Sequence, residues 1–220
     1  MSGATRKSAD APPGFVLPAL PLALLESVRS HDRPGEFLED EDFTQSMPRR
    51  LGLTGVVFTQ IRRYEEAQRT GKAVPFADVV SLMQLVLRRP DAGAIFHQTG
   101  RMMAQRRADK VPQAFVKLIR VLPGAGAGSA ARVARRLVRA LSGGGAIEAH
   151  PRPFHIRFLD CPIATLDALG TACAIYTGAI DTTLSTYTGR AGRIEHTLCR
   201  ARGDDVCEWR ELEKKDEPGE

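Results

Sequence analysis

Four residues near the C-terminal end have the types and spacing of a metal site. Cys199 and Cys207 flank Gly203, which favours a tight turn because glycine adopts positive φ without a steric penalty. A hairpin centred on Gly203 puts the two cysteines opposite each other, with both side chains on one face. His196 precedes Cys199 by three residues, and Cys173 lies upstream on a separate predicted element. Three thiolates and one imidazole suit a closed, tetrahedral, structural zinc site.

The same hairpin leaves two questions open. Cross-strand geometry also permits a disulfide between Cys199 and Cys207. Residues three apart on a regular strand face opposite sides, so His196 and Cys199 converge only if the strand begins late or contains a bulge. Cys161 is left outside the predicted site, because its spacing matches no ligand position and Pro162 after it indicates a packed loop thiol.

The order Cys173, then His196-x2-Cys199-x7-Cys207, resembles the C-terminal zinc motif of 4-vinyl reductase domains. That family usually has Glu at the position of His196, and Glu195 is adjacent, so either residue is a candidate fourth ligand; the spacing favours His196. The resemblance covers about residues 50–213 and continues, with decreasing strength, through residues 173–178, 159–162 and 93–100. It implies a fold shared with nitric-oxide-binding haem domains and with subunits of the transport protein particle that tethers vesicles.

Composition and charge are those of an ordinary globular protein. The chain has 220 residues, 43% hydrophobic and 26% charged, which is enough for one good-sized core. A net charge of +5 permits an anionic partner without requiring one. Four cysteines and no recognisable secretory signal favour a reducing, cytoplasmic setting. We expect no membrane span, because no apolar run approaches the roughly 18–20 residues that one needs.

Hydrophobic periodicity predicts the order of the elements. Helices are predicted over residues 20–28, 54–70, 75–88, 91–106, 111–122, 130–141 and 171–187, and strands over residues 146–150 and 154–159. With the terminal hairpin, this order predicts an α+β domain whose helices pack on one face of a four-stranded antiparallel sheet. Residues 1–45 are expected to be largely disordered or a linker, residues 46–213 to form the domain, and residues 214–220 to be a charged tail. The glycine-rich segment 123–129 is expected to be flexible.

Two further groups of residues are candidate binding surfaces. We expect an apolar ligand cavity between helices and sheet, lined by Phe96, Phe154, Phe158 and Tyr176; the alternative is a filled core. A stripe of arginines on one predicted helix is a candidate surface for an acidic protein partner, or else a solvated face; it comprises Arg132, Arg135, Arg136 and Arg139. Few aromatic residues accompany the stripe and no recognised motif is present, which argues against nucleic-acid binding.

The motifs argue against a hydrolase. No Gly-x-Ser-x-Gly, Walker or His-Glu-x-x-His pattern occurs, and four protein ligands leave a zinc ion no position for a reactive water. We therefore expect a non-catalytic regulatory domain that senses a small apolar molecule and acts through a partner protein. The resemblance supports this, because related domains in bacterial regulators bind small aromatic effectors beside the zinc site. It also implies two alternatives, an enzyme or accessory protein of bacteriochlorophyll (tetrapyrrole) synthesis and a homodimeric assembly scaffold.

Overall fold

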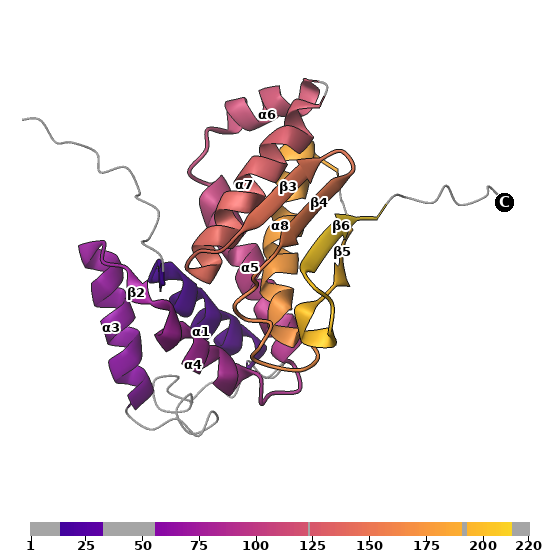
Figure 1. Cartoon of the computed structure of the whole chain (residues 1–220). Coiled ribbons are helices and arrows are strands. Elements are labelled where there is room, and N and C mark those ends of the chain that lie inside the picture. Colours follow the sequence, from indigo (N-terminus) through magenta and orange to yellow (C-terminus); the bar gives the residue numbers. More distant parts are fainter. Residues whose placement is uncertain (1–13, 33–55, 123, 191–192, 213–220) are drawn as a thin grey trace, which may run out of the picture.

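A four-stranded antiparallel sheet and a group of α-helices form an α+β fold, as predicted. The structure is a computed structural model, and it describes residues 14–32, 56–122, 124–190 and 193–212 (Figure 1). Its helices are α1 (Ala19–His31), α3 (Val56–Thr70), α4 (Phe76–Val86), α5 (Ala92–Ala108), α6 (Gln113–Val121), α7 (Ala125–Ser142) and α8 (Ala174–Thr188). Its strands are β1 (Phe15–Val16), β2 (Val74–Pro75), β3 (Ile147–Pro151), β4 (Phe154–Phe158), β5 (Ile194–Leu198) and β6 (Cys207–Glu211).

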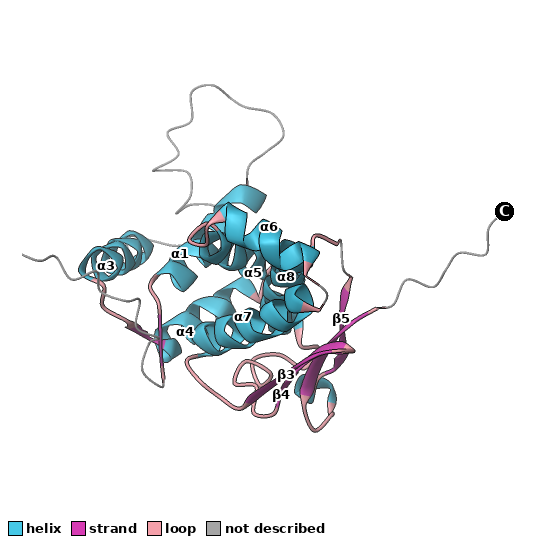
Figure 2. Ribbon diagram, turned by 90° about the horizontal axis from the view of Figure 1, so that it is seen from above, coloured by secondary structure: helices cyan, strands magenta, loops and turns pink. Residues whose placement is uncertain are grey.

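The larger sheet places the C-terminal strand in its interior. Its order is β3-β4-β6-β5, and β1 pairs separately with β2. Phe158 on β4 lies opposite both Ile147 on β3 and Cys207 on β6. Helix α7 packs against β3 and β4, and α8 packs against β5, so these two helices lie next to the sheet (Figures 1 and 2). Cys207 therefore begins a strand that is paired on both sides, which fixes its backbone.

Two glycines allow α5 and α8 to approach closely. A Cβ atom added at Gly100 on α5 would lie 1.9 Å from the carbonyl oxygen of Ile175. A Cβ atom added at Gly178 on α8 would lie 2.0 Å from the carbonyl oxygen of His97. Neither distance is sterically allowed, so the backbones meet only because both positions lack a side chain. This contact fixes α8, and with it Cys173 at its N-terminal end.

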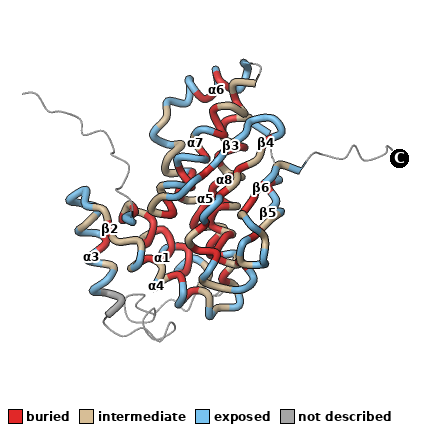
Figure 3. Tube along the Cα trace, viewed as in Figure 1, coloured by how far each residue is buried: buried red, intermediate tan, exposed pale blue. Residues whose placement is uncertain are grey.

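The core runs continuously through the described helices and the sheet. Buried residues line α1, α5, α7 and α8 as well as β4 and β6 (Figure 3). The alternating pattern of β4 leaves Phe154, Ile156 and Phe158 buried, while His155 and Arg157 are half-buried. Within the described residues, no helix has the length and apolar character needed to cross a membrane.

The glycine-rich segment departs from the prediction of a flexible link. Helix α7 begins at Ala125, five residues earlier than predicted, and includes Gly126 and Gly128. A Cβ atom at Gly126 would lie 2.7 Å from the carbonyl oxygen of Tyr187, at the end of α8. Gly126 thus allows α7 to pack closely against the end of α8, and this packing overrides the low helix propensity of glycine.

The N-terminal segment also contributes more to the fold than the sequence indicates. Leu20, Leu24 and Val28 on α1 are buried, and α1 packs against α5. The helix predicted over residues 20–28 is therefore present as α1, and its buried residues belong to the core. The predicted domain boundary at residue 46, the acidic run at residues 39–42 and the tail at 214–220 lie outside the described residues.

Candidate metal centre

The four predicted ligands converge. One donor atom from each of Cys173, His196, Cys199 and Cys207 lies within 4.8 Å of all the others. The three cysteines have no exposed surface and His196 is half-buried. A single ion at the Zn–S distance of about 2.3 Å and the Zn–N distance of about 2.0 Å is able to join donors this close together. No disulfide links the cysteines, all four of which are free thiols.

The helical ligand comes from the N-terminal end of α8. A short 3-10 helix, Thr171–Cys173, leads into α8, and Cys173 is the residue that immediately precedes the first α-helical turn. Asp167 holds this approach, because its carboxylate accepts hydrogen bonds from the backbone N–H groups of Thr171 at 2.9 Å and Ala172 at 3.2 Å. The free amides and the dipole at a helix start favour a negatively charged sulfur there.

A change of register in the terminal hairpin brings His196 to the side of the cysteines. His196 lies opposite Trp209, whereas Leu198, two residues later, lies opposite Glu208, only one residue earlier. One extra residue is therefore accommodated on β5, which is the bulge that the sequence required for convergence. Glu195, the alternative ligand, pairs across the strands with Arg210, is exposed and does not belong to the cluster.

The indole of Trp209 orients the histidine ring. The two rings are stacked, with centroids 4.5 Å apart and an interplanar angle of 5°. The Nε1–H group of Trp209 donates a hydrogen bond to Oγ1 of Thr177 on α8 at 3.0 Å. The Nε2 atom of His196 is buried and has no oxygen or nitrogen partner within the described parts of the chain, and the His196 side chain interacts with the Cys207 thiol. Because buried polar atoms are rarely left unpaired, this nitrogen fits a metal ligand.

The turn between β5 and β6 shapes the position of Cys199. The backbone N–H of Cys199 donates to Oδ2 of Asp204 at 2.6 Å, and Gly203 adopts a positive φ of 98°. Gly170, on the segment before α8, leaves space for the sulfur: a Cβ atom there would lie 2.5 Å from Sγ of Cys199. Sequence reasoning did not identify Gly170, since nothing local to it indicates which residue packs above it.

Cys161 also lies against the cluster, although sequence reasoning set it apart. Its thiol is buried and interacts with the thiols of Cys173 and Cys207. The strand pairing explains this position, because β4 ends beside Cys207 and Cys161 follows β4 by three residues. The fourth cysteine is therefore a neighbour of the predicted ligands, and the spacing of the ligand motif contains no signal for it.

The thiols have unequal proton affinities. Hydrogen bonds from Cys161 and then Cys173 hold the pKa of the Cys207 thiol well below its usual range. Contacts with Cys161 and Cys207, followed by burial, raise the pKa of Cys173. Burial raises the pKa of Cys199, although the N–H groups of Ala201 and Arg202 oppose this effect. Of the three cysteine ligands, Cys207 is thus the one whose surroundings favour the thiolate, and a bound cation would favour the thiolate form of Cys173 and Cys199 as well.

The predicted aromatic ligand pocket consists of buried side chains. The rings of Phe158 and Tyr176 pack edge to face, with centroids 5.7 Å apart. The rings of Tyr176 and Trp209 pack in the same way, with centroids 5.5 Å apart. Phe96 on α5 and Phe154 on β4 are also buried. None of the four predicted residues lines the groove that the structure contains between α1, α3 and the C-terminal end of α5. A ligand cavity among these four residues remains a prediction.

The predicted arginine stripe is exposed on α7. It comprises Arg132, Arg135, Arg136 and Arg139. Arg132 bonds to its own helix, through Gly128 and Ser129, and the other three form no ion pair with any residue that the structure describes. The stripe is free to meet an acidic surface, and the partner remains a prediction.

Comparisons with known proteins provide no family assignment for this chain. No protein-family model matches the chain, and no curated protein matches it. The resemblance to 4-vinyl reductase domains thus remains an interpretation of the ligand motif and its neighbouring segments.

Proposed function

We propose that this chain is a non-catalytic, zinc-containing regulatory domain that binds a small apolar molecule and acts through a partner protein. The observation that carries the zinc assignment is the buried cluster of three thiols and one unpaired imidazole nitrogen. Thiolate and imidazole donors favour zinc over magnesium or calcium, which prefer oxygen ligands. We further propose a reducing compartment such as the cytoplasm, where the thiols of such a site would stay reduced.

The metal has a structural role in this proposal. Its ligands come from the start of α8 and from the β5–β6 hairpin, so that bound zinc joins the C-terminal hairpin to a central helix. Four protein ligands complete a tetrahedral shell and leave no position for an activated water. The site would thus stabilise the sheet without performing chemistry.

The regulatory part of the proposal concerns the surfaces around this framework. The helices would cover one face of the sheet and enclose an apolar ligand between the two layers. The exposed arginines of α7 would contact an acidic partner. We further propose a homodimer, as the resemblance to 4-vinyl reductase domains implies.

Metal analysis combined with native mass spectrometry tests the proposal. Protein purified under reducing conditions is expected to contain one zinc ion per chain and to show the mass of a zinc-bound dimer. A retained small-molecule mass would support the ligand-binding role, whereas a tetrapyrrole absorbance band would replace it with the pigment-synthesis alternative. Metal-free protein with two fewer free thiols than the four in the sequence would overturn the zinc assignment in favour of a disulfide.

A further inference from the structure

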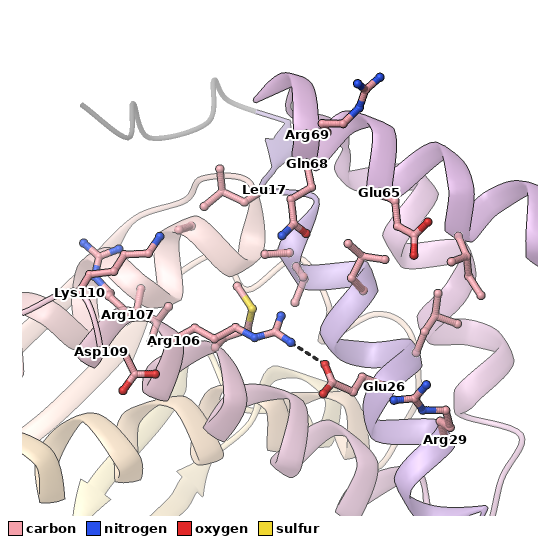
Figure 4. A pocket seen from close by; sticks show the side chains of 18 of the residues that line it. Leu17, Glu26, Arg29, Glu65, Gln68, Arg69, Arg106, Arg107, Asp109 and Lys110 are labelled. Atoms are coloured by element: carbon pink, nitrogen blue, oxygen red, sulfur yellow. Dashed lines mark hydrogen bonds and ion pairs between the residues drawn. The ribbon is translucent and has the colours of Figure 1, made fainter. Parts of the chain in front are cut away.

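A large open groove lies between α1, α3 and the C-terminal end of α5 (Figure 4). Its volume is about 1140 Å³, slightly above the range of small-molecule sites, roughly 300–1,000 Å³. Its lining residues include none of the candidate metal ligands and none of the four predicted aromatic residues. The groove is therefore a feature separate from the metal centre.

The floor of the groove is apolar. Leu20 and Leu25 of α1, Met103 of α5 and Leu137 of α7 line it and are buried. Leu17, Leu22, Ile61 and Val111 continue this surface and are half-buried. A ligand with an apolar body would remove from water the surface that the half-buried residues still expose, at about 25 cal/mol for each Å² buried.

Cationic side chains lie at one end of this floor. Arg106 bonds through Nη2 to Oε2 of Glu26 at 2.5 Å, so this ion pair links α5 to α1. Arg107 and Lys110 reach the same end of the groove beyond Arg106 (Figure 4). Neither forms an ion pair or hydrogen bond through its side chain with any described residue, and Arg107 is half-buried.

The acidic residues of the rim leave these two cations available. Glu26 is already held by Arg106. Glu65 lies across the groove on α3, and the carboxylate of Asp109 points away from Arg107 and Lys110 (Figure 4). The groove thus combines an apolar floor with two adjacent cations, Arg107 and Lys110, at one end, whereas a single arginine, Arg29, lies at the opposite end (Figure 4).

We propose that this groove binds a small amphipathic anion, with its apolar body on the leucine and methionine floor and its carboxylate at Arg107 and Lys110. The inference rests on the proposed function only in treating the chain as a ligand-binding domain. It names the ligand class and gives it a site apart from the zinc centre. Charge complementarity favours an anion over a neutral or cationic molecule of the same shape.

Calorimetric titration of the full zinc-loaded chain with dodecanoate, below its micelle-forming concentration, tests this site. Saturable binding of one dodecanoate per chain is expected. Dodecan-1-ol and dodecyltrimethylammonium have the same chain without the negative charge, and each is expected to bind about tenfold more weakly or worse, because hydrogen bonds to charged groups contribute strongly. Equal binding of all three probes, or uptake that does not saturate, overturns the proposal.

Variants locate the head group. The double substitution Arg107→Gln and Lys110→Gln is expected to weaken dodecanoate binding about tenfold or more. Arg29→Gln is the matched control, because Arg29 also lines the groove but lies at the opposite end (Figure 4), and it should change binding less than twofold. Equal loss in the two proteins contradicts the assigned head-group position.

Zinc content measured on the same samples separates this inference from the zinc assignment. Zinc-loaded protein that does not bind dodecanoate overturns the groove proposal and leaves the metal site intact. A last variant carries Gln or Asn in place of Glu39, Asp40, Glu41 and Asp42. If dodecanoate binds only to that variant, the anion of the groove is the chain's own acidic run, and the small-molecule proposal fails.

Discussion

At the scale of single residues, stacking holds the ring of His196 in place, whereas its buried Nε2 atom has no oxygen or nitrogen partner among the described residues. Trp209 stacks on the ring, and Trp209 is itself tied to α8 through Thr177. The unpaired Nε2 atom costs free energy in the absence of a partner, about 1–3 kcal/mol for a buried polar group. A metal–nitrogen bond would remove that cost, and the stacked tryptophan means that little ring motion must be frozen for it to form.

Substitution of a ligand should remove both metal and stability. Cys199→Ser is expected to lose zinc and to lower the free energy of unfolding by about 4 kcal/mol or more, since loss of a structural metal is among the most severe changes. Cys161→Ser is the matched control, because Cys161 is equally buried beside the cluster but is not one of its four donors. Elemental analysis and urea denaturation, with and without a chelator, measure both effects. Loss of zinc from Cys161→Ser would mean that the ligand set is wrong.

Gly170 provides a test of the space around one ligand. Gly170→Ala would place a Cβ atom 2.5 Å from Sγ of Cys199 and would also strain a residue at φ 72°. Gly71→Ala is the control, with a similar φ of 66° and nothing within 4 Å of the added atom. Both variants should lose about 1–2 kcal/mol from backbone strain, and only Gly170→Ala should bind zinc more weakly. Competition with a chromogenic chelator measures the affinity, and equal affinities would show that Cys199 does not depend on this space.

At the scale of elements, the contact between α5 and α8 depends on its paired glycines. Gly178→Ala is expected to force the helices apart and to lower the free energy of unfolding by about 1–3 kcal/mol, as overpacking does. Gly128→Ala on α7 is the control, because nothing lies within 4 Å of its added Cβ atom, and helix propensity predicts a gain of up to about 1 kcal/mol. Thermal or urea denaturation distinguishes the two, and a stable Gly178→Ala protein would contradict the close contact.

Elements that depend on interactions between residues close in the sequence could be predicted, whereas features that depend on distant residues could not. Most helices and strands were predicted to within a few residues, because periodicity is a local property of the sequence. The convergence of the four candidate ligands was also predicted, from the hairpin register and the spacing of the motif, with a bulge as the condition for His196 and Cys199 to share a face. The early start of α7 at Ala125, the burial of α1 and the neighbourhood of Cys161 were missed. Each depends on which distant backbone packs alongside, and no local pattern encodes that.

At the scale of the whole molecule, the packing of α5 against α8 connects two regions, in each of which side chains link separate elements. At one side, the candidate metal centre joins α8 to the hairpin that carries Cys199 and Cys207. At the other, Arg89 links the end of α1 to the start of α5, through Nη2 to Oδ1 of Asp32 at 2.6 Å and Nε to Oδ1 of Asp91 at 2.8 Å. The proposed groove lies toward the other, C-terminal end of α5, between α1, α3 and α5.

The link through Arg89 should make part of the stability depend on pH. The hydrogen bond from Arg89 lowers the pKa of Asp91 below its ordinary value. A carboxyl group whose folded pKa is lowered stabilises the fold above the unfolded value of about 3.9, and this contribution is lost as the pH falls through the lowered pKa. Asp91→Asn is therefore expected to reduce the free energy of unfolding by about 1 kcal/mol at pH 7, with the difference from the unsubstituted protein shrinking below about pH 4.

Urea denaturation of both proteins from pH 7 to pH 3 measures that difference directly. Acid also displaces metal from thiolate sites, but this affects both proteins at a given pH and so cancels in the comparison. Glu66→Gln is the control, because Glu66 pairs with Arg69 within one exposed helix, where ion pairs contribute little. If the difference in unfolding free energy between Asp91→Asn and the unsubstituted protein stayed constant down to pH 3, the charge of the Asp91 carboxylate would not be what stabilises this link between α1 and α5.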